Sequence, residues 1–118
     1  MKLTLKQHPW GQSKQFCKNK ICTVKIITLN KNSALSLQYH NLRDEFWHVI
    51  SGSAKVVIHN NTIDCKTGDE FFVPRKTKHR IITKEFDVKI LELAYGKFED
   101  TDIVRLKDKY ARAKYRDI

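Results

Sequence analysis

The chain has few of the residues that break or cross-link a backbone. Its 118 residues include four glycines, two prolines and three cysteines. An odd number of cysteines at irregular spacing argues against a disulfide framework and fits a reducing compartment, so we expect a cytoplasmic protein. Cys17 and Cys22 are either metal ligands or ordinary thiols, and no second close pair of cysteines supports the metal alternative.

Long apolar runs are also absent. No segment approaches the roughly 20 apolar residues that a membrane-spanning helix needs. The start, MKLTLKQHPWG, has no apolar run of signal-peptide length. No repeat, low-complexity segment or linker divides the chain, and its length suits one modest core. We therefore expect one domain over residues 1–118 and no membrane partner.

Negative charge is outweighed by positive charge. Lys and Arg number 23 against 13 Asp and Glu, which gives a net charge of +10. Such a domain attracts polyanions or small anionic substrates. The basic residues cluster only in PRKTKHR, residues 74–80, which could bind nucleic acid or clamp a phosphate. No aromatic platform lies beside this cluster and no groove-reading helix is predicted, so we expect no nucleic-acid partner.

Short strand-like segments recur about every ten residues through the middle of the chain. Apolar, β-branched or alternating patterns predict strands at 21–29, 33–40, 45–51, 54–60, 79–83 and 87–96, with two more between 60 and 74. Ser51-Gly52-Ser53 predicts a turn between two of them. Because no amphipathic helix pattern intervenes, we predict an all-β sandwich or barrel. A short strand at Ile103–Leu106 should precede a helix or a frayed end.

Side chains that can bind a metal gather in SLQYHNLRDEFWHVISG, residues 36–52. Alternation places Gln38 and His40 on one face, and Glu45 joins them if both strands turn that face inward. His79 opens a later strand and could supply a fourth ligand. A buried face with these groups is costly unless they are paired or hold a metal. Nitrogen and oxygen ligands without thiolate fit zinc, manganese, iron or cobalt, although such residues in β domains are more often surface groups.

Four blocks of the sequence resemble the C-terminal cupin domain of type II phosphomannose isomerases. They are HPWG (8–11), LSLQYHNLRDEFWHVISGSA (35–54), FFVPRKTKHR (71–80) and DIVRLKDKYAR (102–112), in the order of that family and over nearly the whole chain. The resemblance implies a single cupin domain over 1–118, all-β, with a double-stranded β-helix (a small jelly-roll barrel). The barrel would span about 20–96, between an N-terminal arm (1–19) and a C-terminal segment (97–118). No Gly-rich nucleotide loop occurs, so we expect no guanylyltransferase activity.

The resemblance also implies a function, metal-dependent interconversion of mannose 6-phosphate and fructose 6-phosphate. A proton would move between C1 and C2 through an enediolate, with a divalent transition metal, zinc in the first place, stabilising the oxyanion. The implied metal ligands are Gln38, His40, Glu45 and His79. The implied catalytic residues are Arg43 and Glu92, the latter with a structural role as its alternative.

Binding of the phosphorylated hexose is expected to use cationic side chains, namely Arg43, Lys76, Lys78, Arg80 and Arg105. A surface or strand-end salt bridge is the alternative role for Arg105. The resembling family further implies a homodimer. A non-catalytic, or differently specific, metal- or sugar-binding cupin is the alternative function.

The chain departs from the family pattern at several positions, and three of them bear on the site. Phe46 replaces a histidine, Lys76 a glycine and Ala94 a glutamine. Residue 46 should point away from Glu45, so the metal set is expected to survive, whereas a proton relay through that histidine is not. Of the two tryptophans, Trp47 should lie in the barrel core, and Trp10 should anchor the N-terminal segment on the barrel.

Overall fold

The computed structural model describes residues 3–109, and every regular element within that range is a β-strand. The strands are β1 (Thr4–His8), β2 (Gly11–Gln15), β3 (Cys22–Leu29), β4 (Leu37–Tyr39), β5 (Arg43–Ile58), β6 (Asn61–Lys66), β7 (Glu70–Val73), β8 (His79–Ile82), β9 (Val88–Gly96) and β10 (Val104–Lys107). The all-β prediction is therefore confirmed. In the part of the chain that is described, no helix is long and apolar enough to cross a membrane.

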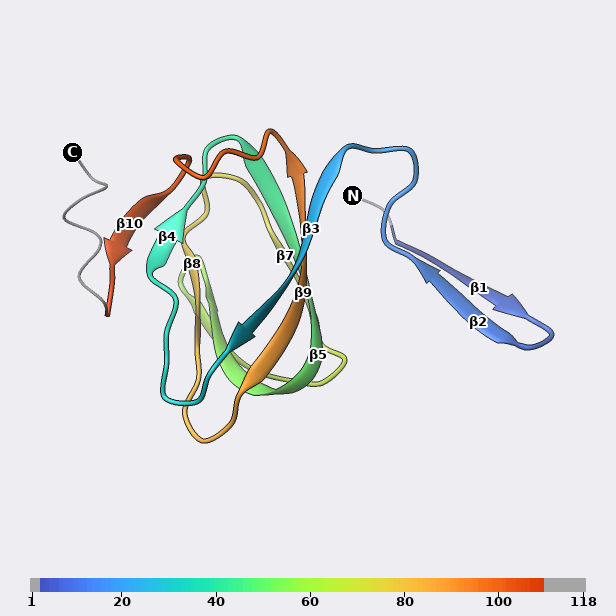
Figure 1. Cartoon of the computed structure of the whole chain (residues 1–118), viewed down its shortest axis with the longest axis horizontal. Helices are drawn as coiled ribbons and strands as arrows, with labels where there is room; N and C mark the ends of the chain where they lie inside the picture. The colour runs from blue at the N-terminus through green and yellow to red at the C-terminus, as the bar shows by residue number, and fades with distance from the viewer. Residues whose placement is uncertain (1–2, 110–118) are drawn as a thin grey trace.

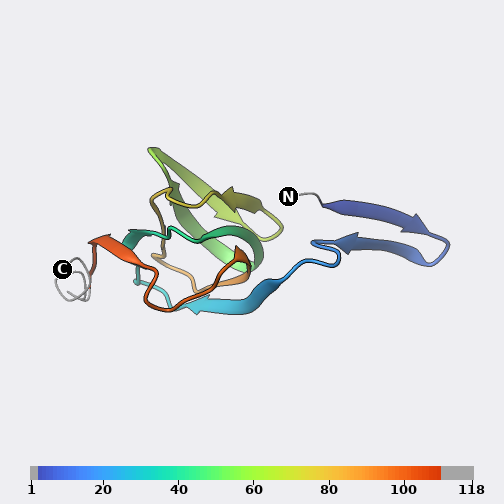
Figure 2. The same ribbon diagram turned by 90° about the horizontal axis from the view of Figure 1, so that it is seen from above.

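The strands other than β1 and β2 form one antiparallel barrel. Their order is β10-β4-β8-β5-β9-β3, and β6 and β7 both pair with β5. Figures 1 and 2 show these strands wrapped around a common interior, while the β1–β2 hairpin extends to one side. The strand β3 pairs only with β9 along this path, so it forms one edge of the sheet.

The longest strand, β5, belongs to both walls of the barrel. Its first part pairs with β7 and β9, and its second part pairs with β6 and β8. The register on β9 shifts between Val49 and Ser51, and Gly52 follows with a φ of +91°. The predicted turn at Ser51-Gly52-Ser53 is wrong, because the chain bends there without losing its strand pairing. A β-bulge increases local bend and twist in this way.

The core lies between the two walls. Trp47, Val49, Val56 and Ile81 have no exposed side-chain surface, and Ile90 is 1% exposed. Complete burial of one such apolar side chain stabilises the fold by about 1.5–3 kcal/mol. The predicted core position of Trp47 is confirmed, and it places the indole next to the polar groups that share its face of β5.

The N-terminal arm makes a hairpin that sequence analysis did not predict. Trp10 is 74% exposed and stacks on His8, with ring centroids 4.6 Å apart, so the prediction that Trp10 anchors the arm is wrong. The turn of the hairpin points away from the barrel (Figures 1 and 2). Phe16 contacts the barrel instead, through the Phe46 ring at 5.8 Å.

The C-terminal segment returns along the barrel. The predicted strand at Ile103–Leu106 exists as β10, shifted by one residue. It pairs with β4, which brings the chain past the site described below. The predicted helix or frayed end lies outside the described residues.

Candidate metal centre

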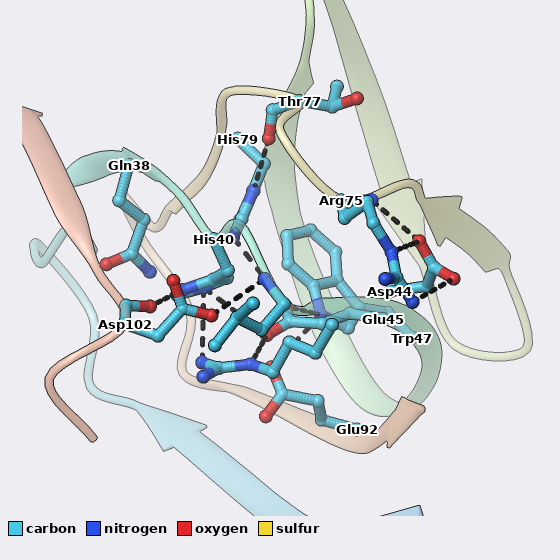
Figure 3. A network of polar contacts seen from close by, with 12 residues as sticks. Gln38, His40, Asp44, Glu45, Trp47, Arg75, Thr77, His79, Glu92 and Asp102 are labelled. Carbon is cyan, nitrogen blue, oxygen red and sulfur yellow. Dashed lines mark hydrogen bonds and ion pairs between the residues drawn. The ribbon is translucent and has the colours of Figure 1, made fainter. Parts of the chain in front are cut away.

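Two histidines and one glutamate converge inside the barrel. His40 follows β4, Glu45 lies near the start of β5, and His79 opens β8. All three are buried, and their potential ligand atoms lie within 4.8 Å of one another. The His40 Nε2 is 3.4 Å from Glu45 Oε2, and the His79 Nε2 is 3.6 Å from Glu45 Oε1. Figure 3 shows the two imidazoles and the carboxylate facing a common point.

Backbone carbonyls determine which nitrogen of each imidazole is free. The Nδ1–H of His40 donates to the carbonyl of Asp102 at 2.7 Å, and that of His79 donates to the carbonyl of Thr77 at 2.9 Å (Figure 3). A carbonyl only accepts, so the lone pair of each ring lies on Nε2, toward Glu45. Metal-binding histidines are oriented by such partners.

Burial keeps both imidazoles neutral near pH 7. It lowers the pKa of His40 to about 4, with the Arg43 charge acting in the same direction. Burial likewise lowers the pKa of His79. Among the described residues, the His79 Nε2 is buried and has no hydrogen-bond partner. An unpartnered, neutral imidazole nitrogen is costly in a protein interior unless it serves a ligand, so this donor set fits a divalent transition metal.

Gln38, the fourth predicted ligand, lies next to the converging groups. It is directly opposite His79 in the β4–β8 pairing, so the two side chains share a face. Its Oε1 accepts a hydrogen bond from Ser36 Oγ at 3.0 Å. Both Gln38 and Ser36 line the same cavity as His40 and Glu45. Gln38 thus lies in the same cavity as His40 and Glu45, and opposite His79 in the strand pairing.

This cavity has a volume of about 330 Å³ and is lined by both polar and apolar side chains. Its charged lining balances formally, with three cationic residues (Lys25, Arg43, Arg105) and three acidic residues (Glu45, Glu92, Asp100). The segment between β9 and β10 contributes Phe98, Asp100 and Ile103 to the wall. That segment therefore covers one side of the site.

Arg43 is held beside the three converging groups. Its Nε donates to Glu45 Oε2 at 3.0 Å, and its second terminal nitrogen donates to His40 Nε2 at 3.2 Å. The guanidinium carbon lies 4.2 Å from the centroid of the Phe98 ring, and the residue is buried. The planar fork of donors is thus fixed at the cavity, as recognition of an oxygen-rich ligand requires.

Glu92 is placed in the site by the strand register. Across β3, β9 and β5, Lys25, Glu92 and Trp47 are consecutive partners in one row. The Trp47 Nε1–H lies 3.3 Å from both Glu45 Oε1 and Glu92 Oε1, and Lys25 Nζ lies 3.7 Å from Glu92 Oε2 (Figure 3 shows the first two contacts). Burial, followed by the Glu45 charge, raises the pKa of Glu92 to about 7. A carboxyl group with such a pKa can accept and return a proton near neutral pH.

The predicted phosphate-binding residues divide into two groups. Arg43 and Arg105 line the cavity, whereas Lys76, Lys78 and Arg80 do not. The Nε of Arg80 donates to the Leu35 carbonyl at 3.1 Å. Lys76 is exposed and has a φ of +64°, a left-handed conformation that favours glycine, which explains the glycine of the resembling family at this position.

Sequence analysis missed Lys25 as a residue of the site. It is the single charged side chain in the apolar strand β3, which was the available signal. Its Nζ lies 4.6 Å from the centroid of the Phe98 ring, so it stands at the same wall as Arg43. The Asp102 carbonyl was missed as well, and no side-chain pattern could have indicated a backbone partner.

The departure at Phe46 lies outside the site. Residues 45 and 46 alternate along β5, and Phe46 turns its ring toward Phe16 of the N-terminal segment. It is 3% exposed under this cover. The expectation that residue 46 points away from Glu45 is confirmed, and the three converging groups are unaffected.

A barrel of this topology with His, Glu and His directed into its interior defines a cupin. The sugar phosphate isomerase of Silicibacter pomeroyi, a solved structure of the cupin superfamily, aligns with a TM-score of 0.59 over 64% of this chain and 51% of that chain, at 19% identity. Residues 3–108 match the family model described as mannose-6-phosphate isomerase C-terminal, so the chain belongs to that family.

Two similar proteins are much longer than this chain. The alginate biosynthesis protein AlgA of Pseudomonas aeruginosa is 32% identical over 106 residues, and the mannose-1-phosphate guanylyltransferase ManC of Salmonella typhimurium is 28% identical over 106 residues. In both comparisons 88% of this chain is covered but only 22% of the relative. The chain thus spans about a fifth of the length of these relatives.

Proposed function

We propose that this chain is a metal-dependent isomerase that interconverts mannose 6-phosphate and fructose 6-phosphate. One observation carries the proposal. Two neutral imidazole nitrogens and a buried carboxylate converge beside Glu92, whose pKa is raised to about 7. Membership of the mannose-6-phosphate isomerase C-terminal family supports this choice of substrate.

The metal would be held by His40, Glu45 and His79, with Gln38 as the fourth ligand. Zinc is the first candidate, and manganese, iron and cobalt suit the same nitrogen and oxygen donors. When bound, a divalent ion supplies Lewis-acid stabilisation of the negative charge that develops on the sugar oxygens. The Nδ1–H bonds of the two histidines keep the rings oriented for this purpose.

Proton transfer between C1 and C2 is assigned to Glu92. The Trp47 indole N–H fixes one carboxyl oxygen of Glu92, and the other oxygen, 3.7 Å from Lys25 Nζ, is buried without a hydrogen bond among the described residues. This second oxygen is therefore available to take the proton from one carbon and return it to the other. Arg43 would orient a sugar hydroxyl or carbonyl oxygen next to it.

Charge matching supports a sugar phosphate as the ligand. The cavity lining is formally balanced, so a divalent ion leaves it with an excess of about two positive charges, against a phosphate monoester charge of about −1.5 to −2. Lys25, Arg43 and Arg105 are the phosphate anchors that line the cavity. The loop cations Lys76, Lys78 and Arg80 are a second candidate set.

The proposed enzyme is a homodimer. Val24 and Ile26 are exposed on the edge strand β3, and these apolar side chains support association of two copies of the chain. Sedimentation equilibrium would measure the oligomeric state.

The full chain, loaded in turn with zinc, manganese and cobalt, should convert mannose 6-phosphate into fructose 6-phosphate in a coupled assay. Glu92→Gln should keep its metal and lower kcat by about 100-fold or more, because the amide cannot take up the proton. Absence of turnover with every metal would refute the isomerase. Metal and sugar-phosphate binding without turnover would instead support the non-catalytic cupin.

Comparison of Lys25→Ala with Lys78→Ala distinguishes the two candidate anchor sets. If Lys25 binds the phosphate, its replacement should weaken mannose 6-phosphate binding by about tenfold, the typical effect of losing one charge-assisted hydrogen bond. Lys78→Ala should then have little effect, because Lys78 does not line the cavity. Calorimetric titration of the metal-loaded proteins measures both. If Lys78→Ala weakens mannose 6-phosphate binding and Lys25→Ala does not, the phosphate site would instead be assigned to the loop of residues 74–80.

A further inference from the structure

Two cysteines meet where the N-terminal hairpin joins the barrel. Cys17 follows β2 and Cys22 begins β3, and their Sγ atoms are 3.7 Å apart. Both side chains are partly buried, and neither takes part in the candidate metal centre. The intervening residues 18–21 are all exposed, and Asn19 has a φ of +55°, so the chain turns back on itself there.

One tyrosine holds both ends of this turn in place. The Tyr95 hydroxyl donates to the carbonyl of Phe16 at 3.2 Å, next to Cys17. The backbone of Tyr95 pairs in register with Cys22. The two thiols are therefore positioned by contacts that do not involve sulfur, and little additional ordering is needed to join them. Such positioning gives two reacting groups a high effective concentration.

The third cysteine is different, and this difference provides an internal control. Cys65 is 3% exposed and belongs to the barrel core. Cys17, by contrast, lines a cavity of about 430 Å³ between the N-terminal segment and the barrel, together with Lys18, Lys20 and Tyr95. A small oxidant can reach Cys17 through this cavity, whereas Cys65 is covered.

We propose that Cys17 and Cys22 are a modification site, a dithiol that a peroxide-class oxidant converts into an intramolecular disulfide. The Cys17 thiolate attacks one peroxide oxygen, the O–O bond breaks, and the leaving oxygen takes a proton to form water. The sulfur of Cys22 then displaces the hydroxyl of the Cys17 sulfenic acid, which leaves with a proton as a second water. Two thiols and one hydrogen peroxide give one disulfide and two waters.

The disulfide would fix how the hairpin leaves the barrel. Residues 16–21 connect β2 to the edge strand β3 (Figure 1), so a covalent link from Cys17 to Cys22 closes a small ring at this junction. The hairpin itself forms a separate two-stranded sheet. Oxidation would thus reduce the freedom of the hairpin relative to the barrel, without adding a contact to the candidate metal centre.

The test treats the full chain with a small excess of hydrogen peroxide. Under denaturing conditions the thiol count should fall from three to one, and the intact mass should fall by two hydrogen atoms. Trypsin cleaves after Lys14, Lys18, Lys20 and Lys25, so peptides 15–18 and 21–25 should stay joined by the disulfide until a reductant is added. Dithiothreitol should restore all three thiols.

Three variants distinguish this pair from other oxidation. Cys65→Ser should behave like the parent chain, whereas Cys17→Ser and Cys22→Ser should each lose the intramolecular disulfide. Three results would overturn the proposal: oxygen added to sulfur without loss of the two hydrogens, peptides 15–18 and 21–25 that separate without reductant, or a disulfide that disappears in Cys65→Ser. Because the readouts are mass and thiol count, failure here leaves the isomerase proposal unaffected.

Discussion

Replacement of His79 with alanine is expected to lower the zinc affinity of the chain by about 100-fold or more. Loss of a residue that only orients a metal ligand already costs about 10–100-fold, so loss of a ligand should cost at least as much. The His79 Nε2 is buried, faces Glu45 at 3.6 Å and has no hydrogen-bond partner among the described residues. Calorimetric titration of the metal-free protein, with metal content after dialysis, measures the effect.

A matched control comes from a histidine on the opposite face of β5. His48 bonds to Glu70 through Nδ1 at 2.7 Å, so His48→Ala should leave zinc affinity unchanged. Since His79 is 1% exposed, alanine also leaves a cavity, and His79→Gln serves as a variant of similar volume. Unchanged zinc affinity in both folded His79 variants would contradict the assignment of this residue as a ligand.

Replacement of Gly52 with alanine should destabilise the fold by about 3–5 kcal/mol, near the upper end of single-residue effects. A Cβ atom at this position would lie 2.1 Å from the Asp87 carbonyl oxygen, and the φ of +91° is unfavourable for alanine. Gly52 lies in β5 and pairs with Val88 of β9, which directly follows Asp87, so neither stretch of backbone can move aside easily. Urea unfolding at equilibrium gives the change in free energy.

Gly68 separates the two causes of this effect. Its φ is +92°, nearly the same as that of Gly52, but an added Cβ would have no atom within 4 Å. Gly68→Ala should therefore cost only the backbone strain, about 1–2 kcal/mol. The difference between the two variants measures the steric contact. Equal losses of stability would show that the close approach of Asp87 to Gly52 is unimportant.

The fold could be predicted from sequence wherever local patterns decide it. Alternation in residues 45–49 and the apolar residues of 21–29 identified β5 and β3, and turn residues identified the ends of β6. The bend of β5 could not be predicted in the same way. Ser51-Gly52-Ser53 has the composition of a turn, and only the continued pairing with β9 and β6 makes it part of a strand.

The residues of the candidate metal centre also fall into those that local sequence patterns predict and those that only the tertiary structure brings together. Gln38, His40 and Glu45 are close in sequence, so strand alternation was enough to propose a shared face. Lys25 and Glu92 are distant in sequence and meet only because β3 and β9 pair in one particular register. The backbone carbonyls that orient the two histidines belong to loops, whose paths no side-chain period describes.

By itself, the sequence determined the strand composition, the identity of the potential metal ligands and the family resemblance, because each depends on residue types at short spacing. The tertiary structure alone decided which cations face the cavity, with Lys25 lining it and Lys76, Lys78 and Arg80 lying outside it. It also decided that Phe46 is covered by Phe16 and that Cys17 lies beside Cys22. These contacts follow from strand register and chain path, which depend on pairing between distant segments.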